Sequence, residues 1–172
     1  MRRMVPYRGG RPVNGGILPL LLLSSTFGLA LSFVPWPAAW KGLAAFAMAA
    51  VASLLIQIPR SLNDGFFVGL WLSVIMIAAL AYLPVARTTP RAIAVGLYAG
   101  LWIGVGASVS GLRPNLLLAL LPALVFLPGK WFTGRGYPIV IQVVASWMIA
   151  IASLSLFVSL MPTPGYKPDH MQ

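Results

Sequence analysis

Six apolar stretches, separated by clusters of proline and glycine, are the feature that most constrains the fold of this chain. They cover residues 17–34, 42–58, 65–83, 92–111, 115–127 and 137–161. Apolar runs of roughly 18 or more residues are typical of membrane-crossing helices. No stretch alternates as the strands of a membrane barrel do, and helices pair their own backbone groups in lipid. The sequence therefore predicts an all-α, polytopic transmembrane helix bundle, a single domain over 17–161.

The number of membrane segments stays between five and six, because the fifth stretch is short. Residues 115–127 contain Pro122 and are followed by Gly129 and Lys130, which we expect to end the helix. At about 1.5 Å per residue, this stretch covers about two-thirds of a ~30 Å hydrocarbon core. It either spans a thinned bilayer or forms a re-entrant or interfacial hairpin.

Composition excludes a soluble domain and narrows the partners. Hydrophobic residues make up 59% of the chain and charged residues 8%, whereas soluble domains carry about 25% charged residues. The 12 Lys and Arg residues outnumber 2 Asp and Glu residues, but they stand singly between apolar runs, where they contact anionic headgroups. We expect anionic lipids and no nucleic acid as partners. The chain has no cysteine, and we expect neither a metal nor a cofactor.

Charge also predicts the orientation. Residues 1–16 carry four arginines and read as a flexible basic cytoplasmic tail, and 162–172 form a polar C-terminal tail. With six spans, seven basic residues lie on the N-terminal side against five on the other, and with five spans the division is eight to four. Both divisions favour a cytoplasmic N-terminus. We expect the membrane to be a bacterial inner membrane. The start of the chain imitates a signal peptide, with basic residues followed by an apolar stretch and PWPAAW. Residues 17–34 are longer than a usual signal h-region, so we expect this helix to be retained.

A near-repeat runs through the third and fourth stretches. Residues 59–74 and 90–105 share seven of sixteen residues, including GLW in both copies. Glycines and other small residues recur four apart, on one face of each helix: Gly65 and Gly69 in the third stretch, and Ala92, Gly96, Gly100, Gly104 and Ser108 in the fourth. Small residues let helix backbones touch in lipid. The fourth helix is therefore predicted to pack closely, either within the bundle or against another subunit.

The last stretch carries a polar face. Gln142, Ser146 and Ser153 align with Ala145 and Ala150, and we expect this face to point into the bundle. Its side chains either make interhelical hydrogen bonds or line a polar path for a substrate.

Charged groups near the segment ends favour structural roles. Lys130 and Arg135 lie in 128–138, predicted to be an interfacial turn with aromatic anchors in which both cations contact lipid headgroups. Asp64 precedes the third stretch and reads as part of a helix cap, the alternative being a proton-coupled site. No nucleophile stands beside a base as catalysis requires, so we do not expect an enzyme.

Together these features predict a non-catalytic integral membrane subunit of a larger membrane complex, which packs through the glycine-rich helix face against other membrane protein subunits. The alternative is a small transporter or channel for a small or lipidic substrate, alone or as an oligomer, with the Gln142 face lining its path.

Overall fold

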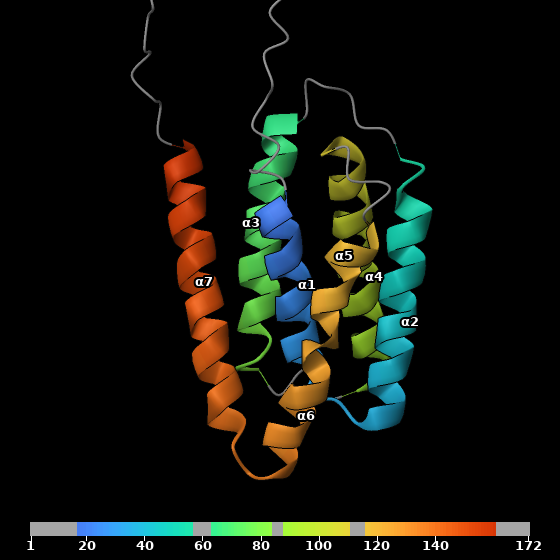
Figure 1. The fold of residues 1–172 in the computed structure, drawn as a ribbon, viewed down its shortest axis with the longest axis vertical. Helices are drawn as coiled ribbons and strands as arrows, with labels where there is room; N and C mark the ends of the chain where they lie inside the picture. Colours follow the sequence, from blue (N-terminus) through green and yellow to red (C-terminus); the bar gives the residue numbers. More distant parts are fainter. Residues whose placement is uncertain (1–16, 57–62, 84–87, 111–115, 161–172) are drawn as a thin grey trace, which may run out of the picture.

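Figure 1 shows the computed structural model of the chain, which describes residues 17–56, 63–83, 88–110 and 116–160. All regular structure in these residues is helical, which confirms the predicted all-α class. The elements in chain order are α1 (Ile17–Leu31), α2 (Trp36–Ser53), α3 (Asn63–Ala79), α4 (Thr89–Val109), α5 (Leu116–Leu120), the 3₁₀ turn η5 (Leu121–Val125), α6 (Phe126–Gly134) and α7 (Pro138–Leu160). Because α5, η5 and α6 follow one another without a break, the described residues form six helical rods.

Three of these rods are long and apolar enough to cross a membrane: Thr89–Val109, Leu116–Gly134 and Pro138–Val158. Helix α1 and the segment Gly65–Ala79 are apolar but shorter. Prolines occupy the first turns of α2, α4 and α7, where the missing N–H would be unpaired in any case. Helix α2 starts at Trp36, six residues before the predicted apolar stretch, because its first two turns carry tryptophans and a lysine as well as apolar residues.

The fifth rod is longer than the sequence suggested. It continues past Gly129 and Lys130 to Gly134, and Pro122 is accommodated in the first turn of η5. A side chain at position 129 would collide with the Ser32 hydroxyl, so Gly129 lets α6 lie close to the end of α1. The predicted interfacial turn at 128–138 is therefore mostly helix. The chain turns at 135–137, where Gly136 has a φ of +83°, a conformation that favours glycine.

Helix α1 lies at the centre of the bundle (Figure 1). It contacts α3, α4, α5, η5, α6 and α7, and eleven of its fifteen residues are buried. A helix that is apolar on all sides is expected to be surrounded by other helices. Its buried hydroxyls are paired within the helix: Ser24 bonds the Leu20 carbonyl at 3.0 Å, and Thr26 bonds the Leu23 carbonyl at 2.9 Å.

Helix α7 lies at the edge of the bundle, beside α3 (Figure 1). Ile141, Ala145 and Ala152 are buried on its inner side. Large apolar side chains stand out from its other side, among them Trp147, which is 70% exposed, and Leu154, which is 66% exposed. Of the three long apolar rods, α7 is therefore the least buried.

Candidate functional site

The glycine row of α4 packs against α2 of the same chain. A Cβ atom added at Gly96, Gly100 or Gly104 would collide with backbone carbonyl oxygens of α2, those of Gly42, Phe46 and Ala50 respectively. Helix α2 meets this row with a face of small buried residues: Gly42, Ala45, Ala49, Ala50 and Ser53. The two backbones approach so closely that α4 has no room for a side chain at these three glycines.

Hydrogen bonds join α2 and α4 at the far end of the row. The Ser53 hydroxyl donates to the Ala50 carbonyl at 3.1 Å and lies 3.4 Å from the Gly100 carbonyl. The Ser108 hydroxyl lies 2.8 Å from the Val105 carbonyl and 3.3 Å from the Ile56 carbonyl beyond α2. Ala92 closes the row at its other end and is buried. The row is thus covered by α2 along its length and is not an open surface.

The glycines of α3 have different surroundings. A Cβ at Gly69 would meet the Trp102 ring, whereas Gly65 faces open space. Phe66 also packs on Trp102, with ring centroids 4.9 Å apart. The two copies of the repeat therefore meet each other, since the glycine of the first GLW contacts the tryptophan of the second. None of the described residues lies within 4 Å of a Cβ added at Gly65, so they make no close helix contact there.

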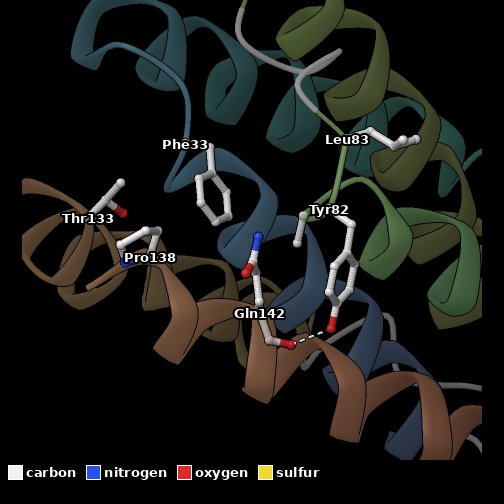
Figure 2. Close-up of a pocket in the computed structure, with 7 residues that line it drawn as sticks. Phe33, Tyr82, Leu83, Thr133, Pro138 and Gln142 are labelled. Carbon is white, nitrogen blue, oxygen red and sulfur yellow. Dashed lines mark hydrogen bonds between the residues drawn. The ribbon is translucent and has the colours of Figure 1, made fainter. Parts of the chain in front are cut away.

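A cavity of about 580 Å³ opens where α1 and α3 end and α7 begins (Figure 2). We call this the Trp36 end of the bundle, because α2 also begins there. The residues that line the cavity are Phe33, Ala81, Tyr82, Leu83, Thr133, Pro138 and Gln142. All of them lie in the first two or last two turns of their helices or just beyond, so the described walls of the cavity belong to this end of the bundle.

Tyr82 and Gln142 form the polar wall of this cavity. The Tyr82 hydroxyl donates to the Gln142 backbone carbonyl at 2.6 Å and lies within hydrogen-bonding distance of the Ser146 hydroxyl. The side-chain amide of Gln142 points away from Tyr82, toward Phe33 across the cavity (Figure 2). None of the described residues forms a hydrogen bond with that amide. Gln142 thus offers both donors and an acceptor to whatever fills the cavity.

A second cavity of about 410 Å³ adjoins the first and shares Phe33 and Thr133 with it. Its remaining lining residues are Ser32, Val34, Pro35, Trp36, Lys130 and Gly134. The Lys130 ammonium donates to the Val34 carbonyl and lies 5.5 Å from the centre of the Trp36 ring. The Thr133 hydroxyl bonds the Gly129 carbonyl at 2.7 Å. Lys130 and Thr133 therefore lie together in the last turns of α6, beside this cavity.

The two cations expected at headgroups point in different directions. Lys130 turns inward to the second cavity, and only part of it is exposed. Arg135 is exposed just after α6, and its guanidinium stacks 3.9 Å from the centre of the Trp131 ring. Of these two cations, Arg135 is the one that lies exposed on the surface.

The polar face predicted for α7 does not point inward as a unit. Gln142 is half-buried and Ser146 meets Tyr82, but Ala150 and Ser153 are exposed. The reason is that α7 buries the side bearing Ala145 and Ala152 against its neighbours, and Ser153 lies about 100° around the helix from Ala152.

Tyr82 and Thr133 were missed by sequence reasoning. Tyr82 stands at the end of an apolar stretch, where an aromatic residue reads as an interfacial anchor, and its partner Ser146 is 64 positions away. The predicted tails 1–16 and 162–172, and the side chain of Asp64, lie outside the described residues.

Within the described ranges, no three His, Cys, Asp or Glu residues gather as metal ligands would. Comparison with protein-family models, with curated proteins and with solved structures gave no match to this chain.

Proposed function

We propose that this chain is a non-catalytic integral membrane subunit of a larger complex, and that it contacts its partner through the exposed side of α7. The membrane part of the proposal rests on the three long apolar rods. It is also supported by the ring of half-exposed aromatic residues at the Trp36 end: Trp36, Trp40, Tyr82, Trp131 and Tyr137. Such rings mark the depth of lipid headgroups.

The sequence placed the partner contact on the glycine row of α4. Because α2 covers that row, a contact with another protein must use a different face. Small residues are exposed on one side of α7, where Ser146, Ala150 and Ser153 recur at intervals of four and three residues. This exposed small-residue side of α7 is the observation that carries the proposal, since small residues let a second helix approach in lipid.

The occupant that fits this side is a transmembrane helix of another protein. No described residue accepts a hydrogen bond from the Ser153 hydroxyl, and an unpaired hydroxyl is costly in hydrocarbon. A neighbouring helix with a backbone carbonyl or polar side chain at that depth would supply the partner. The other exposed side of α7, with Trp147, Ile151 and Leu154, carries large apolar groups suited to lipid.

Site-specific photocrosslinking in intact membranes tests the proposal. A photoreactive residue at position 153 should give one defined adduct with another integral membrane protein, and Ala150→Leu should abolish it. The matched control is Ala44, an exposed alanine of α2, where neither a crosslinker nor Ala44→Leu should have an effect. Adducts with lipid alone at position 153 would show that this side faces the bilayer. An adduct of twice the chain's mass would assign the face to a second copy.

A small transporter or channel is the second candidate, supported by the Gln142 amide facing a cavity (Figure 2). A transport path must reach both faces of the membrane, whereas the described residues that line this cavity lie at the Trp36 end. We therefore rank the transporter below the subunit. Uptake of a solute by vesicles containing the purified chain alone would reverse this order.

A further inference from the structure

The two adjoining cavities at the Trp36 end have the polar groups of a binding site. Lys130 lines one cavity and Gln142 the other, and Phe33 and Thr133 belong to both. We propose that the paired cavities bind the phosphate of an amphipathic anion, and that this anion is an anionic phospholipid.

The donors match this chemistry. The Lys130 ammonium has three protons, of which the Val34 carbonyl accepts one, so it retains donors for a phosphate oxygen. The Gln142 amide has two more N–H donors without a partner among the described residues. A phospholipid presents two kinds of acceptor, phosphate oxygens and ester oxygens, which suit an ammonium donor and an amide donor respectively. The phosphate belongs beside Lys130, and the ester oxygens belong beside Gln142.

Charge favours an anion over a cation or a zwitterion. None of the described residues that line the two cavities is a carboxylate, and Arg135 follows Gly134 directly at the rim of the second cavity. Partial burial also strengthens the attraction of Lys130 for a phosphate relative to a lysine in water.

The surroundings favour a lipid over a soluble phosphate. Leu83 at the first cavity and Ile139 beside it are more than half exposed, and they offer apolar surface for acyl chains. The exposed rings of Trp131 and Tyr137 lie on either side of the α6–α7 turn, which sets the cavities at headgroup depth.

Native mass spectrometry of the purified chain tests the site. The probes are phosphatidylglycerol and phosphatidylcholine with identical acyl chains. We expect tighter binding of phosphatidylglycerol. Lys130→Gln should weaken that binding roughly tenfold, as loss of a hydrogen bond to a charged group does, and Lys130→Arg should retain it. The matched control is Lys41→Gln, which removes an exposed charge from the same end of the bundle outside both cavities, and it should change the affinity less than twofold.

Three results would overturn the proposal. Equal effects of Lys130→Gln and Lys41→Gln would mean that binding is a general surface attraction. Equal affinity of the wild type for both lipids would remove the role of charge. Displacement of phosphatidylglycerol by millimolar inorganic phosphate would assign the cavities to a soluble phosphate. If Lys130→Gln fails to fold because the Val34 carbonyl loses its hydrogen-bond donor, Gln142→Leu becomes the variant that tests the site. It should weaken both lipids alike, since both carry ester oxygens, and unchanged affinities would refute the site.

Discussion

The contact between α2 and α4 makes a sharp prediction at Gly100. A Cβ at this position would lie against the Phe46 carbonyl oxygen, 2.9 Å from the Ala49 Cβ and 3.0 Å from the Ala50 nitrogen. Most of these neighbours are backbone atoms, so the clash is relieved only if the helices separate. Overpacking of this kind costs about 1–3 kcal/mol. Because alanine suits a helix better than glycine by roughly 0.5–1 kcal/mol, Gly100→Ala should lose up to about 2.5 kcal/mol. Gly100→Leu should lose about 3 kcal/mol or more.

The assay is thermal unfolding in mild detergent. For a chain of 172 residues, each kcal/mol lowers Tm by about 2–4 °C, so Gly100→Leu should lower Tm by about 6–12 °C. Gly65→Ala is the matched control, because Gly65 is a helical glycine and no described residue lies within 4 Å of a Cβ added there. It should leave Tm unchanged or raise it slightly. If Gly100→Ala behaves like Gly65→Ala, α2 does not cover the glycine row and the packing described here is wrong.

Two further substitutions test other contacts. Tyr82→Phe removes the hydroxyl that joins α3 to α7 at Gln142. It should lower Tm by about 2–4 °C and speed proteolysis of α7. Unchanged proteolysis would show that this hydrogen bond does not hold the helix in place. Gly28→Ala places a Cβ against the Ala123 carbonyl of η5 and should lower the free energy of unfolding by about 1–3 kcal/mol. Gly134→Ala is the control, because no described residue lies within 4 Å of a Cβ added there. Equal Tm values for the two variants would contradict the close contact between α1 and η5.

The sequence was informative about which residues form helices, because long apolar runs and proline clusters act locally. It was less informative about which helices meet. The spacing of Gly96, Gly100 and Gly104 predicted a close contact. The partner face on α2, however, consists mainly of alanine, which also occurs on exposed helix faces such as that of Ala44. Small residues indicate that another helix can approach closely, but they do not identify that helix.

The fifth rod shows where local rules fail. Gly129 and Lys130 normally discourage a helix in an apolar setting, yet both lie within α6. Tertiary contacts explain this, since Gly129 makes room for Ser32 and Lys130 finds the Val34 carbonyl. Both partners lie about a hundred positions earlier in the chain. The sequence could not predict the cavity at Gln142 for the same reason, because the walls of this cavity come from four separate segments.

Both the α7 interface and the lipid site require that the rods cross a bilayer. The distribution of basic residues further predicts that the Trp36 end lies on the outside. The chain has no cysteine, so single cysteines report their side of the membrane without background. With six crossings and a cytoplasmic N-terminus, Arg135→Cys in the α6–α7 turn should react with an impermeant maleimide in intact cells. Asn14→Cys in the N-terminal tail should react only after permeabilisation. Labelling of both cysteines from the same side would mean that the fifth rod does not cross, and would contradict the six-crossing arrangement.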